Sequence, residues 1–464
     1  MRIAIGILSL IITQLSFAQD RVAIIDSVVN DLFKSERFNG NVLVAEKGNV
    51  LYNKSFGNAN ESTKELLNEN SIFELASVSK QFTAMAIVIL KEKGKLSYED
   101  KISTFLPQLS NYKNVTIKHL LNHTGGLPDY MDLMDSLFDK SKIATNKDIV
   151  DLFSKHNPKI LFEPNTKWEY SNTGYAFLAS IIEKVSGTSY GNYLQKAIFK
   201  PLEMNNTFVY TRRFAPKKIS NYAFGYIYSD SLKKYILPDE LEETKMVIWL
   251  DGIVGDGTVN STVNDLLKWD RALYTEKLVS SESKKEIFRA VELNNKSKRD
   301  YGFGWALSDD ETYGKIVNHS GGWPGYKTFI ERHIDNDKTI IVLQNHESVS
   351  TTKLFAYLRS IIYNKPLPVK KERTEIKLTN EQLQKFVGVF EIQESMEVTV
   401  SLKSNQLFVQ LTGQNAFPVF AESELSFFLK VVDAQVEFQL NDKQEVTSLV
   451  LLQGGNKIKA TKKE

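Results

Sequence analysis

Ser77 and Lys80 are the residues of this 464-residue chain whose types and spacing best suit covalent chemistry. A serine hydroxyl is a weak nucleophile until a neighbouring base takes its proton, and a partly desolvated lysine can be neutral often enough to serve as that base. Spacing of three residues on a helix places both side chains on one face, within contact distance. The pair alone is weak evidence, because Ser-x-x-Lys also arises by chance on surface helices.

A second candidate group, Trp168–Asn172, stands directly before a predicted helix. The hydroxyl of Tyr170, if it faces a lysine, can carry a proton to a leaving group. The amide of Asn172 can hold a substrate amide or position the lysine. The alternative is a simple helix cap, since Ser171 and Asn172 both suit the N-cap position.

The third candidate group is Asn318-His319-Ser320-Gly321-Gly322, at the end of an apolar strand. Small residues there allow a substrate to approach the strand backbone closely. His319 can form hydrogen bonds or, when protonated, attract a carboxylate. On its own, a His-x-Gly sequence is uninformative.

Apolar periodicity and turn signals predict the elements that position these groups. They are a helix over 20–36, a hairpin of strands 41–46 and 49–56, a buried helix over 78–93, a helix over 173–186, and strands 326–334 and 338–345. Strands at both ends and a helical middle favour an α/β (α+β) domain over 20–364, with a central antiparallel sheet flanked by helices.

The composition changes near Lys365-Pro366-Leu367-Pro368, which predicts a linker over 365–375. Beyond it, apolar and polar residues alternate in strand-like runs such as 396–402 and 436–440. We therefore predict a small all-β sandwich or barrel over 376–464.

The N-terminus has the pattern of a secretory signal peptide over residues 1–18. Arg2 precedes an apolar core, and Ser16-Phe17-Ala18 forms a small-x-small cleavage site. The alternative is a buried or anchoring helix, although the apolar stretch is short for a membrane span. We expect a periplasmic or secreted protein, cleaved after Ala18, with no stable membrane span.

Composition excludes several classes of function. The net charge of +2 gives no electrostatic footprint for nucleic acid. The absence of cysteine rules out a thiol nucleophile, disulfides and a lipid-anchored N-terminus. His119 and His123 have helical metal-ligand spacing but lack a third ligand, so no metal and no cofactor is predicted. The oligomeric state leaves no signal in the sequence.

Taken together, the order Ser-x-x-Lys, Tyr-x-Asn, His-x-Gly resembles the penicillin-recognising serine hydrolases. That family includes class C β-lactamases, D-alanyl-D-alanine carboxypeptidases, D-aminopeptidases and esterases. The stretches 116–130, 257–266 and 301–305 are similar to the same family, and the resemblance spans about residues 22–362. It implies a β-lactamase/transpeptidase-like domain, and the β-rich tail resembles the lipocalin-like domain that often follows it.

The resemblance also implies roles for single residues. Ser77 would be the nucleophile, Lys80 its general-base partner and Tyr170 the proton shuttle. Asn172 and the motif His319-Ser320-Gly321 would contact substrate, and the backbone N–H groups of Ser77 and Gly322 would form the oxyanion hole.

The predicted function is that of an exported serine hydrolase acting through an acyl-Ser77 intermediate. Its substrate would be a small amide or ester: a D-amino-acid peptide, a peptidoglycan fragment or an ester. His319 and Ser320 replace the Lys and Thr of many relatives, which resembles the peptidase and esterase branches and argues against efficient antibiotic hydrolysis. The alternatives are a true β-lactamase and a catalytically silent module that binds peptidoglycan fragments or a partner protein.

Overall fold

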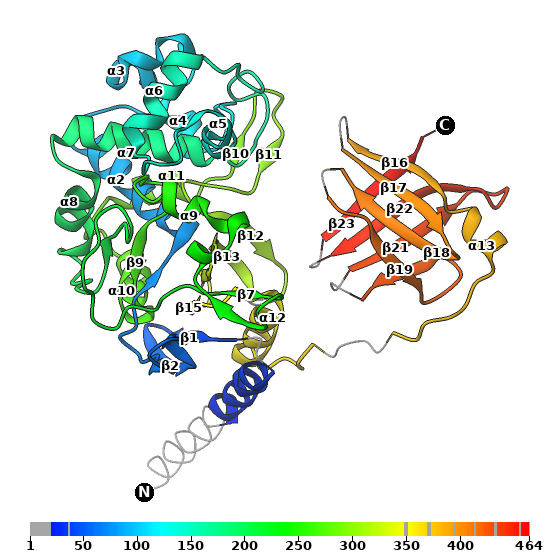
Figure 1. Ribbon diagram of the computed structural model, residues 1–464. Coiled ribbons are helices and arrows are strands. Elements are labelled where there is room, and N and C mark those ends of the chain that lie inside the picture. The colour runs from blue at the N-terminus through cyan, green and yellow to red at the C-terminus, as the bar shows by residue number, and fades with distance from the viewer. Residues whose placement is uncertain are drawn as a thin grey trace, which may run out of the picture. The chain divides into compact units, whose positions relative to one another are not determined.

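The computed structural model describes residues 20–35, 38–347, 351–368, 373–393, 396–412, 414–430, 434–453 and 456–463. The chain divides into two compact units, Met1–Leu367 and Pro368–Glu464 (Figure 1). The predicted signal peptide, residues 1–18, lies outside the described residues. Within the described part of the chain, no helix has both the length and the apolar character needed to cross a membrane.

A six-stranded sheet in the order β12-β13-β14-β15-β1-β2 forms the centre of the first unit. All of its strand pairs are antiparallel. The hairpin between β1 and β2 turns at Lys47 and Gly48, whose φ angles of 51° and 76° are the positive values of a type I′ turn. The strands are β1 (Gly40–Glu46), β2 (Asn49–Phe56), β12 (Ala306–Asp310), β13 (Gly314–Trp323), β14 (Tyr326–His333) and β15 (Lys338–Gln344).

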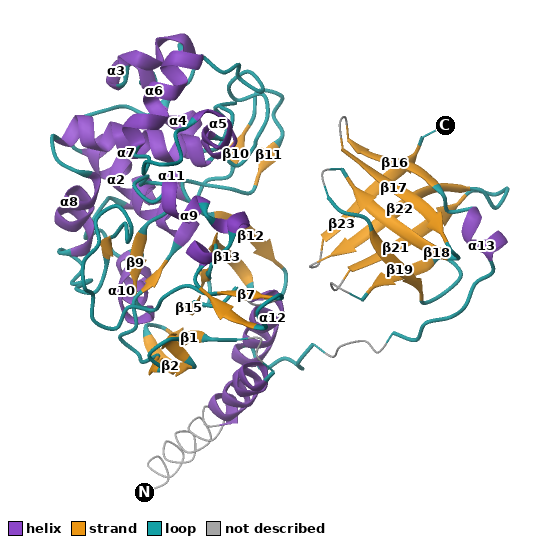
Figure 2. Ribbon diagram, viewed as in Figure 1, coloured by secondary structure: helices purple, strands orange, loops and turns teal. Residues whose placement is uncertain are grey.

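The two faces of this sheet pack against different helices, because successive side chains of a strand point to opposite sides. Leu43 and Ile341 belong to the large apolar core that the sheet shares with the central helices. Their neighbours Val42 and Ile340 pack instead with the helix over 20–34 and with α12 (Thr351–Ile362). Figure 2 shows helices and strands mixed within the first unit, and the predicted α/β (α+β) class is confirmed.

Two long helices, α2 (Lys80–Glu92) and α7 (Asn172–Ser186), run through the helical core of this unit. Every residue of α2 from Lys80 to Leu90 is buried, as its continuous apolar run predicts. Further α-helices of this unit are α3 (Ile102–Phe105), α4 (Ile117–Leu121), α5 (Tyr130–Leu137), α6 (Asn146–His156), α8 (Tyr190–Leu194), α9 (Met246–Trp249), α10 (Val263–Ala272) and α11 (Ser281–Ile287).

Small sheets complete the first unit. The one that bears on the candidate site joins β5 (Phe73–Glu74), β9 (Val259–Ser261) and β6 (Phe208–Val209), in the order β5-β9-β6. The others pair β3 (Asn58–Asn60) with β4 (Glu65–Leu66), β7 (Ile227–Ser229) with β8 (Lys234–Ile236), and β10 (Val291–Glu292) with β11 (Lys298–Arg299).

The second unit is a closed antiparallel barrel, the second of the two predicted all-β forms. Phe390 of the first strand pairs with Lys462 of the last, which closes the barrel. Its interior is filled by a cluster that includes Phe386, Phe427 and Phe438. Its elements are α13 (Asn380–Gln384), β16 (Gly388–Gln393), β17 (Met396–Lys403), β18 (Gln406–Leu411), β19 (Phe417–Ala421), β20 (Ser426–Leu429), β21 (Ala434–Leu440), β22 (Val446–Gln453) and β23 (Asn456–Lys462).

Candidate active site

Ser77 lies in a short 3-10 helix, η1 (Ala76–Ser79), that connects β5 to α2. Ala76, directly before it, has a φ of 48°, in the left-handed region. For a residue with a side chain this conformation costs about 1–2 kcal/mol and persists only where the surrounding structure fixes it. The strained turn presents Ser77 at the edge of a cleft, at the start of a helix that is otherwise buried.

Lys80, three residues later, is completely buried beside Ser77. Its Nζ donates hydrogen bonds to Ser77 Oγ (3.1 Å), Asn172 Oδ1 (2.9 Å) and the backbone carbonyl oxygen of Asp256 (2.9 Å). The Tyr170 ring covers the same amine, with 4.9 Å between Nζ and the ring centroid. These contacts hold the lysine amine against the serine hydroxyl, the geometry that general-base activation of a nucleophile requires.

The segment before α7 caps the helix and also positions the lysine. Ser171 is the N-cap, and its side chain accepts a hydrogen bond from the Gly174 N–H at 3.1 Å. Asn172 accepts from Lys80 through Oδ1 and donates from Nδ2 to Asp129 Oδ2 at 3.1 Å. Of the two roles weighed for Asn172, the contact with the lysine is therefore present in the structure.

The Tyr170 hydroxyl is shielded from solvent and has no hydrogen-bond partner among the described residues. Its ring packs against His123, with 4.4 Å between the ring centroids, and borders the same cleft as Ser77. A hydroxyl without a fixed partner can exchange a proton with the nucleophile or with a leaving group.

Gly321 lets strand β13 pack directly against the nucleophile segment. A Cβ atom at this position would lie 2.1 Å from the Leu75 carbonyl oxygen and 2.3 Å from Thr328 Oγ1. Thr328 Oγ1 itself donates a hydrogen bond of 2.6 Å to the Leu75 carbonyl. The neighbouring Gly322 borders the cleft, where its backbone is close to the reacting site.

His319 is held neutral on the buried face of β13. Its Nδ1 lies 2.7 Å from the Ser320 carbonyl oxygen, which can only accept, so Nδ1 carries the proton. Its Nε2 then accepts a hydrogen bond from the Tyr301 hydroxyl at 2.8 Å. Burial and the nearby Lys80 lower the pKa of His319 to about 3. His319 therefore supplies no positive charge for a substrate carboxylate near neutral pH.

The cleft has a volume of about 510 Å³, and the predicted site residues divide into two groups around it. Ser77, Tyr170, Asn172 and Gly322 border it, with Lys80 buried behind Ser77. His319, Gly321 and the exposed Ser320 are not among the bordering residues. The residues that border it are Glu74, Ala76, Ser77, Tyr130, Met131, Tyr170, Asn172, Met246, Leu250, Asp251, Ile253, Asp256, Gly257, Thr258, Gly322, Trp323, Pro324, Lys327 and Glu347.

Sequence reasoning missed Asp256, Glu74 and Asp251 as site residues. Asp256 reaches Lys80 through its backbone carbonyl, a group that every residue type carries, so the sequence Gly255-Asp256-Gly257 gave only the signal of a tight loop. For Glu74, the available signal was its position three residues before Ser77, in a strand that leads directly to the nucleophile.

His119 and His123 serve separate structural contacts. The Nδ1 atom of His119 accepts from the Thr116 N–H at 3.2 Å, which caps α4. The Nδ1 atom of His123 accepts from the Ser171 N–H at 3.0 Å. In the described ranges of the chain, no group of three or more His, Cys, Asp or Glu residues is arranged to hold a metal ion.

A family model described as Beta-lactamase matches residues 25–361. The chain belongs to this family of serine hydrolases. A second model, a domain of unknown function, matches residues 372–461 of this β-lactamase-family protein. Among curated proteins, penicillin-binding protein 4* of Bacillus subtilis (strain 168) is 44% identical, over 94% of this chain and 98% of its own length. The resemblance to penicillin-recognising serine hydrolases is confirmed.

Solved structures share the fold of this family member at lower identity. An octameric penicillin-binding protein homologue from Pyrococcus abyssi superposes with a TM-score of 0.67 at 23% identity, covering 95% of this chain and 100% of its own. The D-amino acid amidase from Ochrobactrum anthropi SV3, complexed with D-phenylalanine, gives a TM-score of 0.61 at 22% identity, covering 74% and 99%. At these identities, the comparison supports the fold alone.

Proposed function

We propose that this protein is an exported hydrolase that cleaves a small amide or ester bond through an acyl-Ser77 intermediate. The substrate would be a D-amino-acid peptide, a peptidoglycan fragment or an ester. The observation that carries the proposal is the 3.1 Å contact between the buried Lys80 amine and Ser77 Oγ at the edge of a cleft.

In the proposed reaction, Ser77 Oγ attacks the substrate carbonyl carbon as Lys80 or Tyr170 accepts its proton. The backbone N–H groups of Ser77 and Gly322 would hold the oxyanion that forms. The protonated base then gives the proton to the leaving amine or alcohol, and the acyl group stays on Ser77. Water attacks the acyl-enzyme, releases the acid and restores Ser77.

Export is supported by the signal-peptide pattern of residues 1–18, which would direct the mature protein to the periplasm or outside the cell. N-terminal sequencing of protein recovered from the exported fraction tests it. Cleavage after Ala18 gives Gln19 as the first residue, whereas an intact Met1 would contradict export by this route.

Intact-mass measurement tests the nucleophile. Wild type and Ser77→Ala would each be incubated with a penicillin, a cephalosporin and a fluorophosphonate. One acyl or phosphonyl unit on the wild type, and none on the variant, is the expected result. No adduct and no turnover from folded wild type would instead favour a silent binding module.

The same experiment separates hydrolase branches. Rapid release of opened β-lactam would point to a true β-lactamase, whereas a slow or absent penicillin adduct together with fluorophosphonate labelling would point to a peptidase or esterase. We expect the second result, because the neutral His319 leaves its motif without a cation for the β-lactam carboxylate.

A further inference from the structure

The cleft in front of Ser77 has an excess of acidic side chains. Glu74, Asp251, Asp256 and Glu347 all border it. The basic residue that borders it within the described ranges, Lys327, forms an ion pair with Glu347 at 3.3 Å. A cleft lined mainly by one sign of charge concentrates ligands of the opposite sign.

Glu74 is directed to the cleft by the register of its strand. Phe73, the other residue of β5, is fully buried in the apolar core, and successive side chains of a strand point to opposite faces. Pairing of Glu74 with Asn260 of β9 fixes this register. The partly buried Glu74 carboxylate thus borders the same cleft as Ser77, three residues further along the chain.

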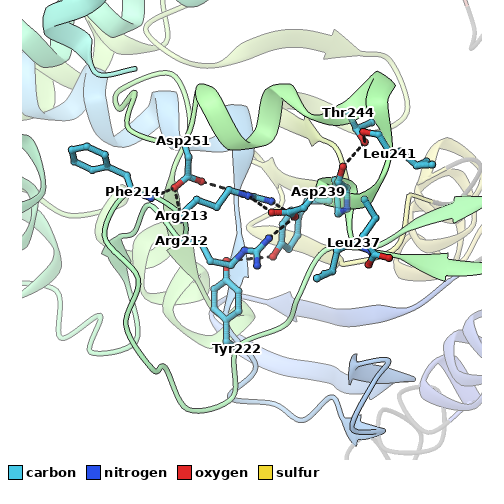
Figure 3. Close-up of polar contacts among 12 residues, drawn as sticks. Arg212, Arg213, Phe214, Tyr222, Leu237, Asp239, Leu241, Thr244 and Asp251 are labelled. Carbon is cyan, nitrogen blue, oxygen red and sulfur yellow. Dashed lines mark hydrogen bonds and ion pairs between the residues drawn. The ribbon is translucent and has the colours of Figure 1, made fainter. Parts of the chain in front are cut away.

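The other carboxylates on this side of the cleft already have partners. Asp256 Oδ2 accepts from the Tyr130 hydroxyl at 2.9 Å. Asp251 accepts from the backbone N–H of Arg213 at 2.6 Å and from its Nη1 at 3.1 Å. Figure 3 shows the contacts of Asp251 with Arg213.

The two arginines nearest to Glu74 are bound elsewhere. Arg213 donates from Nε and Nη2 to the two carboxylate oxygens of Asp239, each at 2.7 Å. Arg212 donates from Nη2 to Asp239 Oδ2, also at 2.7 Å (Figure 3). Within the described part of the chain, Glu74 receives no side-chain hydrogen bond and forms no ion pair. Its carboxylate is therefore available to a ligand.

The segment that Arg212 and Arg213 bind through Asp239 adds apolar side chains to part of the cleft wall. The short helices η4 (Pro238–Glu240), η5 (Glu242–Thr244) and α9 follow one another, and the segment adds Met246 and Leu250 to the wall of the cleft. Charges that meet beside apolar walls interact more strongly than charges in water.

We propose that the carboxylate of Glu74 binds a primary ammonium group of the acyl donor. The donor would be an amino acid amide, or a peptide whose α-amino or side-chain amino group is free. This inference rests on the proposed hydrolase function and names its substrate class. The same carboxylate disfavours a donor that places a free carboxylate there.

Ammonium binding should depend on the ionisation of Glu74. Burial raises the pKa of Glu74 to about 7, and Asp251 adds to the rise, whereas Arg213 and Arg212 oppose it. The hydroxyl groups of Tyr222 and Tyr326 also face this carboxyl. Between pH of about 5.5 and 7, an α-ammonium group stays mostly charged while the ionised fraction of Glu74 rises about 15-fold. Selectivity for the ammonium group should rise with it.

Three p-nitroanilides test the proposal: norleucine anilide with a free α-amine, Nα-acetyl-lysine anilide with a side-chain amine, and Nα-acetyl-norleucine anilide with no cation. Each is supplied as D and L forms. The readouts are kcat/KM and, for any donor that is not hydrolysed, its protection of Ser77 against fluorophosphonate labelling. We expect at least one amine-bearing donor to exceed the uncharged donor by 10-fold or more, and which one does so identifies the amine that binds.

Glu74→Gln should reduce this preference to within about 3-fold, whereas Glu65→Gln, an equal change of charge on the exposed strand β4, should retain it. Tryptophan fluorescence melts check that both variants are folded. Three results would each overturn the inference. They are equal rates and equal protection for all three donors, a preference for the amine-bearing donor that survives Glu74→Gln, and a wild-type preference that stays constant from pH of about 5.5 to 7. Failure of the proposed function looks different, since fluorophosphonate would then leave Ser77 unlabelled.

Discussion

Replacement of Gly321 by alanine tests whether the third motif serves to bring β13 against the nucleophile segment. The added Cβ would lie 2.1 Å from the Leu75 carbonyl oxygen, 2.3 Å from Thr328 Oγ1 and 3.2 Å from the Ala76 Cβ. The Leu75 carbonyl oxygen is a backbone atom and the Ala76 Cβ is bonded directly to the backbone, so neither can move aside without shifting the turn before Ser77. Gly322 is a matched control in the same strand, because a Cβ there meets only Lys327 Nζ, at 3.6 Å.

The expected loss of stability has two parts. Overpacking of a close contact costs about 1–3 kcal/mol. Displacement of Thr328 Oγ1 also removes its 2.6 Å hydrogen bond to the Leu75 carbonyl, which adds about 1 kcal/mol. We therefore expect Gly321→Ala to lower the free energy of unfolding by about 2–4 kcal/mol. The change for Gly322→Ala should stay within about 0.5 kcal/mol.

Urea unfolding followed by tryptophan fluorescence measures this difference in the catalytic unit alone. All five tryptophans of the chain, at 168, 249, 269, 305 and 323, precede the barrel. Fluorophosphonate labelling of Ser77 should also be slower in Gly321→Ala, because the nucleophile turn has shifted. Equal stability of the two variants would refute the packing argument. A stability loss with unchanged labelling would show that the strand supports the fold without setting the position of Ser77.

Three further outcomes are expected. The pKa of His319 falls from an ordinary 6.5 to about 3, so below pH 6.5 the unfolded chain binds a proton that the folded chain does not. In urea titrations, the free energy of unfolding should therefore fall as the pH is lowered towards 4. The fall should be less steep in His319→Gln. Asn172→Ala removes an acceptor of Lys80 and should slow fluorophosphonate labelling of Ser77 about 10- to 100-fold; an unchanged rate would exclude a positioning role. The pKa of Glu74 rises from 4.5 to about 7, so the wild type loses stability as the pH rises through that interval. Glu74→Gln should be about 1–3 kcal/mol more stable than wild type at pH of about 8. Equal stability of the two proteins would contradict the raised pKa.

Local chemistry made part of this molecule predictable from sequence. The positive-φ turn at Lys47-Gly48 fixes a hairpin, and the continuous apolar run after Lys80 requires a buried helix. A three-residue spacing on one helical turn is also a local property, so the meeting of Ser77 and Lys80 followed from it. The class of the fold and the pairing of nucleophile with lysine depended on such short-range rules.

Contacts between distant segments were not predictable in this way. The Asp256 carbonyl, which binds Lys80, is a backbone atom, so no residue type marks it. Arg212 and Arg213 form no ion pair with Glu74 because the folded chain brings Asp239 and Asp251 to them instead. Likewise, the Tyr301 hydroxyl that donates to His319 Nε2 comes from a residue 18 positions earlier and outside the strands of the sheet, which no spacing in the sequence indicates.

The neutral His319 and the unpaired Glu74 favour the same kind of substrate. Two unit charges about 8 Å apart at an effective dielectric constant of 20 interact by about 2 kcal/mol. At that distance from an ionised Glu74, an ammonium group would gain this energy and a carboxylate would lose it, a difference of about 4 kcal/mol. A cationic third motif would offset the penalty for the carboxylate, but His319, with a pKa of about 3, provides no such charge. The proposed ammonium site would therefore favour amine-bearing donors over β-lactams whose only charge is a carboxylate, even though Ser77 and Lys80 have the arrangement needed to attack either.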